Sequence, residues 1–251
     1  MNLEETTVSA DAPSPPEAAA EKPVKRPRAA AKPRAESAAK PKTEAAPKPG
    51  SIATRTSNPM TSLRRAGSHC NLGELYKRYG KLHIALVEFR KAVELAPENS
   101  YYRYKLGDCA AAAGMLHFAI RELETARDLQ PEDGFYHFWL GDLYSRAGRF
   151  SDAIGAMREA TSLAPCDAYY NVRLGVVALQ AGYPREAADA FRQAIALEPD
   201  NASYHCLLGD ASARLGFERQ ALQHYRNAGR LDPYDALYVD RVRQMTTIEG
   251  R

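Results

Sequence analysis

The sequence predicts an all-α fold: a right-handed α-solenoid of five tandem helical hairpins, closed by one further helix and preceded by a disordered N-terminal tail. Two observations lead to this prediction. The first is an internal repeat of 34 residues, a period typical of stacked helical hairpins. The second is a change of composition near residue 58, because nine of the 16 prolines precede Gly50 and all 14 tyrosines follow it.

Residues 1–58 form the predicted disordered tail. The stretch before Gly50 contains no aromatic residue and almost no large apolar one, so it cannot bury enough surface to offset the loss of chain entropy. From Lys22 to Lys48, nine lysines and arginines face two glutamates, which gives a net charge of +7. Such a segment could contact DNA or RNA phosphates without reading sequence, or it could be a self-repelling spacer. The sequence leaves both interpretations open.

The predicted repeat region spans residues 59–233, with five repeats at 66–99, 100–133, 134–167, 168–201 and 202–233. One glycine recurs every 34 residues, each time after a leucine: Gly73, Gly107, Gly141, Gly175 and Gly209. A second glycine series, two alanine series and one proline series keep the same period in all five repeats, beginning at Gly80, Ala85, Ala92 and Pro97. Since the residue types recur in register, each repeat is expected to fold into the same unit.

That unit is predicted to be helix, turn, helix. In the third repeat, Leu140 and Tyr144 lie four residues apart and share one helical face. Gly148 interrupts the pattern. A second helical face starts at Ala153, and Pro165 ends it because proline cannot continue a helix. The recurrent small residues leave room for close helix packing, so bulky replacements at these positions are expected to clash.

The two ends of the array carry their own signals. After Pro233, apolar residues at helical spacing predict one amphipathic capping helix within residues 234–251, with a frayed end: Leu237, Val239, Val242 and Met245. At the other end, Asn58 directly before Pro59 is the expected cap of the first helix.

The repeats resemble tetratricopeptide repeats, whose pattern is L-G-x-x-Y, then A-x-x-x-F, then P, over about 34 residues. The first repeat has every one of these residues: Leu72, Gly73, Tyr76, Ala85, Phe89 and Pro97. One departure is that the family's tryptophan is replaced by His69, Arg103, His137, Asn171 and His205. Four repeats have a tyrosine one residue earlier, and these are expected to pack between hairpins instead: Tyr102, Tyr136, Tyr170 and Tyr204.

The resemblance implies a protein-interaction module whose first helices line a concave groove for a partner peptide. The matching positions predict an aromatic and acidic groove formed by Tyr101, Tyr104, Asp108, Phe135, Phe138, Asp142, Tyr169, Val172 and Asp210. Such a groove is expected to prefer a partner segment with Lys or Arg beside apolar anchors. The structural alternative is that the acids form ion pairs along one helix, since Glu74 with Arg78, Asp142 with Arg146 and Asp210 with Arg214 have the required spacing.

The sequence offers no candidate catalytic residue, cofactor site or metal site. Neighbouring pairs such as His69 and Cys70 diverge on a helix by about 100°, and the four cysteines show no C-x-x-C spacing. The first residues do not read as a secretion signal, and no apolar run is long enough to cross a bilayer. We therefore expect a non-catalytic cytoplasmic scaffold or adaptor without a membrane partner. The alternative is a nucleic-acid-associated protein whose tail binds while the repeats recruit.

Overall fold

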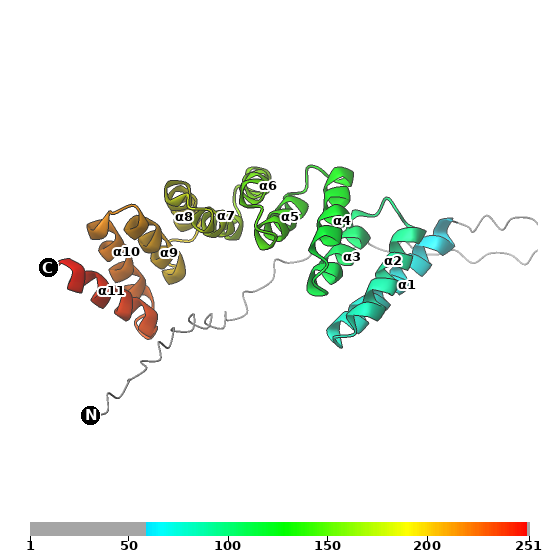
Figure 1. Ribbon diagram of the computed structural model, residues 1–251, viewed down its shortest axis with the longest axis horizontal. Helices are drawn as coiled ribbons and strands as arrows, with labels where there is room; N and C mark the ends of the chain where they lie inside the picture. Colours follow the sequence, from blue (N-terminus) through cyan, green and yellow to red (C-terminus); the bar gives the residue numbers. More distant parts are fainter. Residues whose placement is uncertain (1–58, 250–251) are drawn as a thin grey trace, which may run out of the picture. The chain divides into compact units, whose positions relative to one another are not determined.

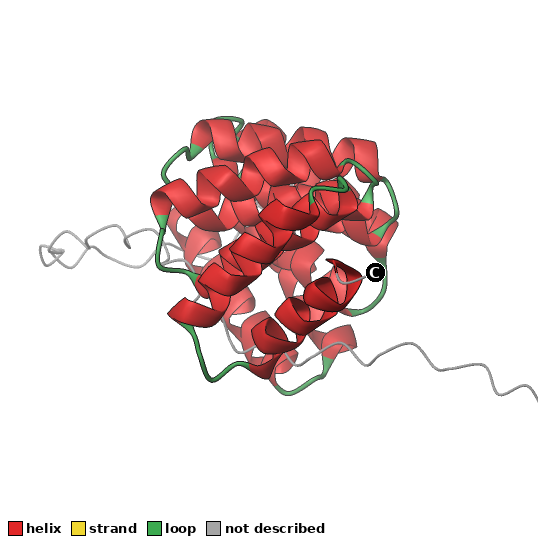
Figure 2. Ribbon diagram, turned by 90° about the vertical axis from the view of Figure 1, so that its left-hand side faces the viewer, coloured by secondary structure: helices red, strands yellow, loops and turns green. Residues whose placement is uncertain are grey.

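The computed structural model describes residues 59–249, which form eleven helices joined by short turns (Figure 1). Within this range Figure 2 shows helices and loops and no strand. The helices are α1 (Pro59–Arg78), α2 (Leu82–Leu95), α3 (Ser100–Ala112), α4 (Leu116–Leu129), α5 (Gly134–Arg146), α6 (Phe150–Leu163), α7 (Ala168–Gln180), α8 (Pro184–Leu197), α9 (Ala202–Arg214), α10 (Glu218–Leu231) and α11 (Ala236–Glu249). The predicted tail, its basic segment and the expected cap at Asn58 lie outside the described residues.

Consecutive helices pair as five helical hairpins, from α1 with α2 to α9 with α10. The second helix of each hairpin also packs on the first helix of the next, and α11 packs on α10 in the same way. This arrangement confirms the predicted all-α array of five hairpins with a closing helix. None of the helices between residues 59 and 249 combines the length and the apolar character that crossing a bilayer requires.

The turn inside each hairpin depends on a glycine with a left-handed backbone. Gly80, Gly114, Gly148, Gly182 and Gly216 have φ between 71° and 81°, a conformation that L side chains disfavour. At the end of α5, the amide of Gly148 donates to the carbonyl of Ser145 (3.0 Å) and that of Arg149 to the carbonyl of Tyr144 (2.8 Å). These two hydrogen bonds form a Schellman motif, which ends a helix with its last carbonyl groups hydrogen-bonded.

The other glycine series keeps the two helices of a hairpin close together. A Cβ added at Gly141 would lie 2.9 Å from Cγ of Met157 and 3.2 Å from the carbonyl oxygen of Ala153. At Gly107 it would lie 2.3 Å from Cδ1 of Leu123. Real Cβ atoms essentially never come within 3.0 Å of such atoms, so the contacts with Met157 and Leu123 supply the physical reason for the expected clash.

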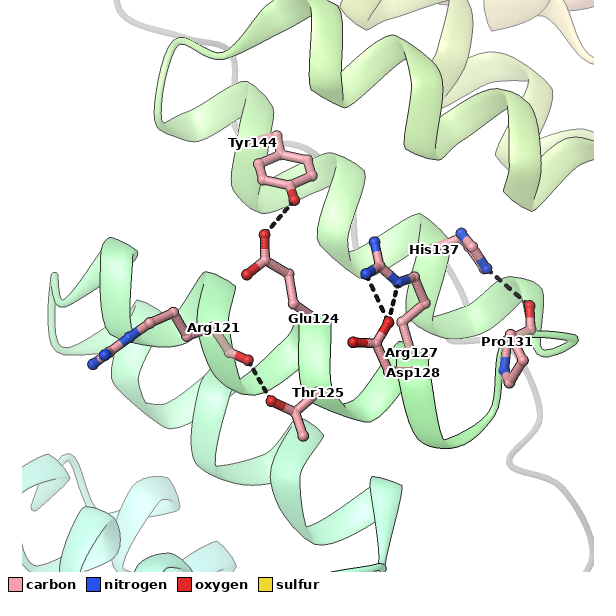
Figure 3. Close-up of polar contacts among 8 residues, drawn as sticks. All are labelled: Arg121, Glu124, Thr125, Arg127, Asp128, Pro131, His137 and Tyr144. Carbon is pink, nitrogen blue, oxygen red and sulfur yellow. Dashed lines mark hydrogen bonds and ion pairs between the residues drawn. The ribbon is translucent and has the colours of Figure 1, made fainter.

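Polar side chains tie neighbouring repeats together where the family's tryptophan would stand. Nε2 of His137 lies 2.9 Å from the carbonyl oxygen of Pro131, as Figure 3 shows. Nε2 of His205 lies 3.1 Å from the carbonyl oxygen of Pro199. Because a carbonyl only accepts hydrogen bonds, each Nε2 carries the proton. Arg103, His137 and His205 therefore fasten the start of a repeat to the proline near the end of the previous one. Asn171 donates to the carbonyl oxygen of Asp167 instead, and His69 contacts Glu88.

The tyrosines beside these residues pack between hairpins as expected. Tyr136 is buried, and its hydroxyl donates to Oγ of Ser100 at the start of α3 (2.9 Å). Tyr170 is also buried, with its ring stacked on that of Phe138 at a centroid distance of 4.8 Å. The series continues beyond the predicted repeats, because Tyr238 in α11 is buried and lies 34 residues after Tyr204.

A second polar cluster joins α4 to α5 (Figure 3). The hydroxyl of Tyr144 points at Glu124 and donates to its Oε1 over 2.6 Å. The guanidinium of Arg149 lies 4.3 Å from the centroid of the Tyr144 ring. Burial, together with the carboxylate of Glu124, raises the pKa of Tyr144 to about 12. Tyr144 therefore stays protonated and acts as a hydrogen-bond donor that holds two repeats in register.

Candidate partner-binding face

The first helices α3, α5 and α7 carry the aromatic residues and the valine of the predicted groove, and the structure divides these residues into two groups. Tyr101 is 47% exposed, and Phe135 and Tyr169 are half-buried. Tyr104, Phe138 and Val172 are only 7%, 5% and 9% exposed. The first group can contact a partner, whereas the second packs beneath it between successive hairpins.

One further aromatic residue lies among them that the sequence reasoning did not identify. Trp139, the single tryptophan of the chain, is half-buried on α5. Its ring centroid lies 5.6 Å from those of Tyr104 and Phe138. The sequence position of Trp139 could have identified it. The same position in the second and fourth repeats holds Lys105 and Arg173, residue types that usually reach solvent, which indicates an outward-facing site. We define the aromatic ledge as Tyr101, Phe135, Trp139 and Tyr169.

Ring contacts connect the ledge across three successive repeats. Tyr104 of α3 meets Phe135 of α5 edge-on, with centroids 4.8 Å apart. Phe138 of α5 meets Tyr169 of α7 at 5.4 Å. Aromatic pairs at such distances contribute about 0.5–1.5 kcal/mol beyond their burial. The ledge is therefore held in place by the buried rings below it and is formed before a partner arrives.

The acidic residues of the predicted groove form ion pairs between repeats. Four first-helix carboxylates pair with a cation 31 residues away on the first helix of the neighbouring repeat. The pairs are Glu74 with Lys105 (2.5 Å), Asp108 with Lys77 (2.5 Å), Asp142 with Arg173, and Asp210 with Arg241 (3.5 Å). Each of these partly exposed pairs contributes at most about 1 kcal/mol. Together they balance the charge along this face.

The alternative interpretation, in which these acids pair with an arginine on the same helix, is wrong for Asp142 and Asp210. Instead of pairing with Asp142, Arg146 donates through Nη2 to the carbonyl oxygen of Ala111 (3.1 Å). Arg214 donates through Nη1 to the carbonyl oxygen of Leu179 (2.8 Å) in the same way. Both carbonyls lie at the C-terminal end of the preceding first helix, where the helix dipole favours a positive charge. Because Arg146 and Arg214 bind these carbonyl groups, Asp142 and Asp210 pair with cations of the next first helix.

Lys105 links the ion pairs to the aromatic residues. Its Nζ lies 5.2 Å from the centroid of the Tyr101 ring and 5.4 Å from that of Tyr104. Burial lowers the pKa of Lys105, but its hydrogen bond to Glu74 and its proximity to Tyr101 raise that pKa by more. Lys105 therefore remains charged, and its position shows that these rings accept a cation on their faces.

The cysteines on this side of the array are packing residues. Cys70 and Cys206 occupy the same repeat position as Tyr104 and Phe138, and both are buried. Burial raises the pKa of the Cys70 thiol to about 11 and that of Cys206 to about 12. Thiols with such pKa values are poor nucleophiles and poor metal ligands at neutral pH. Across residues 59–249, no group of three or more His, Cys, Asp and Glu side chains is placed to hold a metal ion.

Family models described as tetratricopeptide repeat match residues 66–99, 119–168 and 168–201. A search of the curated proteins finds no match.

Solved structures share the fold at low sequence identity. A crystal structure of MamA protein has a TM-score of 0.63 at 21% identity, covering 70% of this chain and 96% of its own. YrrB, described as a TPR protein with an unusual peptide-binding site, has a TM-score of 0.59 at 22% identity, covering 68% and 89%. Pseudomonas aeruginosa pilF has a TM-score of 0.61 at 19% identity, covering 76% and 86%. With its repeated residue pattern, its hairpin packing and these matches, the chain belongs to the tetratricopeptide repeat family.

Proposed function

We propose that the protein is a non-catalytic scaffold or adaptor that holds a segment of a partner protein on the aromatic ledge. The observation that supports this most is the placement of partly exposed rings on three successive first helices, above a buried layer that fixes them. Rigid aromatic side chains are frequent anchors of protein interfaces, since they bury a large area at low entropic cost. YrrB, a protein of the same fold, is described as having a peptide-binding site.

The partner segment proposed for the ledge has apolar or aromatic anchors spaced along an extended or helical stretch. Lysine or arginine beside these anchors is the second proposed feature, because ring faces accept both the methylene stem and the charge. The groove acids contribute less to this preference than the sequence implied. Asp108, Asp142 and Asp210 already have cations from neighbouring repeats, with which a partner lysine has to compete.

Capture of partners from a native cell lysate tests the proposal. The baits are the full chain, a Tyr101→Ala/Trp139→Ala double variant and a Tyr183→Ala control. Tyr183 is a matched control because it is 53% exposed and lies in the turn before α8, away from the ledge. A protein retained by the full chain and the control but lost from the double variant supports the ledge. Equal retention by all three baits refutes it.

Two further expectations belong to the same proposal. The scaffold is placed in the cytoplasm, where free cysteines such as Cys70, Cys109 and Cys206 stay reduced. The basic segment from Lys22 to Lys48 is the alternative functional element and rests on its sequence charge. DNA binding that falls steeply with salt and is lost on deleting residues 1–50 supports nucleic-acid contact; its absence leaves the spacer interpretation.

A further inference from the structure

The helix α11 occupies the position of a first helix after the fifth repeat. Asp235 caps it by accepting a hydrogen bond from the amide of Leu237 (2.9 Å), and Arg241 pairs with Asp210 as Arg173 pairs with Asp142. Where the complete repeats have glycine, however, α11 has Arg243.

That arginine changes what can cover α11. In the fifth repeat, a Cβ at Gly209 would lie 2.6 Å from Cε1 of Tyr225, because α10 packs directly over the glycine of α9. A helix could not approach α11 as closely over Arg243. The side of α11 that corresponds to the covered side of α9 is therefore not built for a second helix packed in the manner of the five complete repeats.

A groove between α10 and α11 lies on this side. It has a volume of about 430 Å³ and is lined by Tyr225, Arg226, Gly229, Arg230, Tyr238, Val239, Val242 and Arg243. Tyr225 and Tyr238 are buried and form its floor, while Val239 is 41% exposed. An apolar floor open to one side can receive an apolar side chain from another segment.

Gly229 leaves space in this groove, and neither the backbone conformation nor the packing requires glycine there. It lies inside α10, has no left-handed φ, and a Cβ there would make only an ordinary contact, 3.8 Å from Cβ of Tyr238. The preceding repeats have larger residues at this position: Val93, Arg127, Thr161 and Ile195. Since glycine inside a helix is unfavourable relative to alanine, its presence opens space at a cost that the packing does not explain.

The charged residues that line the groove are all arginines. Three of the eight lining residues are arginines, and none is a carboxylate. Arg243 pairs with the exposed Asp240 at 3.6 Å, and Arg230 donates to Asn227. Asp210 is paired with Arg241 and Tyr225, and the turn aspartates Asp232 and Asp235 accept hydrogen bonds from the backbone amides of Tyr234 and Leu237. A segment that places an apolar row between aspartates or glutamates complements this surface.

We propose that the groove between α10 and α11 is a second docking site, distinct from the aromatic ledge, for an acidic amphipathic helix of a partner protein. One apolar side chain of that helix enters the hollow over Gly229, and its flanking carboxylates meet Arg226, Arg230 and Arg243. The protein thereby binds two partners, or two parts of one partner, at separate places along the array.

Two synthetic helix-forming peptides test the proposal by fluorescence anisotropy with the full-length Tyr101→Ala/Trp139→Ala variant, in which the aromatic ledge no longer offers the lysine peptide its proposed site. Both have the same apolar row; one has glutamate at the flanking positions, and the other has lysine. The glutamate peptide is expected to bind at least about tenfold more tightly, with an advantage that shrinks as salt screens the charges. Equal binding of the two peptides, or tighter binding of the lysine peptide, overturns the proposal.

Four variants then locate the binding. Gly229→Ile fills the hollow with the residue that α8 tolerates at Ile195, and it is expected to abolish binding of the glutamate peptide. Arg226→Glu/Arg230→Glu is expected to reverse the preference between the peptides, whereas Arg219→Glu, a charge reversal on α10 outside the lining, is the matched control. Trp139→Ala on the ledge is expected to leave binding unchanged. Unchanged binding by Gly229→Ile, or loss in Trp139→Ala, overturns the assignment.

Circular dichroism checks that each variant is folded. If Gly229→Ile does not fold, Gly229→Ala and the double charge reversal carry the test. Sedimentation of the full chain tests whether a second copy of this chain occupies the groove instead of a partner helix. A dimer that Gly229→Ile converts to a monomer would assign the groove to self-association and overturn the proposed partner, while a monomer throughout supports it.

Discussion

Alanine substitution at two helical glycines is expected to change stability in opposite directions. Gly175 lies in α7, where an added Cβ would be 2.4 Å from Cε1 and 2.8 Å from Cδ1 of Phe191. Phe191 is fully buried, so its ring cannot move without displacing its neighbours. Gly155 lies in α6, and a Cβ there would meet no heavy atom within 4 Å. The same chemical change therefore tests packing at one site and helix propensity alone at the other.

The magnitudes follow from these two environments. Alanine gains about 1 kcal/mol over glycine inside a helix, and Gly155→Ala is expected to stabilise the fold by about 0.5–1 kcal/mol. At Gly175 the extra methyl group overpacks the core, which costs about 1–3 kcal/mol. The 2.4 Å separation places this cost at the upper end. After the propensity gain, Gly175→Ala is expected to destabilise the fold by about 2 kcal/mol.

Urea unfolding followed by circular dichroism measures both variants against the unchanged chain. The midpoint and the slope are compared together, because repeat arrays can lose two-state behaviour when one repeat is weakened. The expected order of stability is Gly155→Ala, then the unchanged chain, then Gly175→Ala. If Gly175→Ala were as stable as Gly155→Ala, the argument that the repeat glycines are required by close helix packing would be refuted.

Three further outcomes are expected. Tyr136→Phe removes the hydrogen bond to Ser100 and should lower the free energy of unfolding by about 0.5–1.5 kcal/mol; no loss in urea melts would contradict its role between hairpins. Burial lowers the pKa of His224 below its ordinary value of 6.5, so the unfolded chain binds the proton more readily. The stability that neutral His224 contributes is therefore present above pH 6.5 and is lost as pH falls through it; thermal melts between about pH 5 and 8 should show this slope, and His224→Gln should flatten it. Only Cys166 of the four cysteines is exposed, so a thiol reagent should modify one cysteine in the native chain and four after unfolding, and rapid modification of more than one would show that the core opens.

The hairpin array could be predicted from the sequence because its physical requirements recur at a fixed period. Gly141 is needed for close packing and Gly148 for a left-handed turn, and both needs repeat every 34 residues. The nature of α11 was harder to predict. Arg243 and Val242 replace the glycine and leucine of the pattern. The sequence repeat therefore identifies α11 as an amphipathic segment but does not show that it corresponds to the first helices of the repeats.

The candidate face was predicted only in part, for two physical reasons. Self-comparison finds residues that stay the same, whereas Trp139 differs from its counterparts Lys105 and Arg173 and was therefore missed. Spacing along one helix identifies neighbours on that helix, but the cation that meets Asp142 comes from the next repeat, 31 residues away. Packing between repeats also decides exposure, which buries Tyr104 although its position matches the groove.

The most direct test of the account uses the natural fluorescence of Trp139. It is the only tryptophan of the chain and belongs to the aromatic ledge, so its emission reports on the proposed site without any substitution. The full chain is titrated with a tryptophan-free segment of a captured partner. If the ledge holds the partner, the emission shifts to shorter wavelength and saturates, because binding removes water from the indole. Saturable binding by calorimetry with unchanged Trp139 emission would place the partner elsewhere and contradict the account.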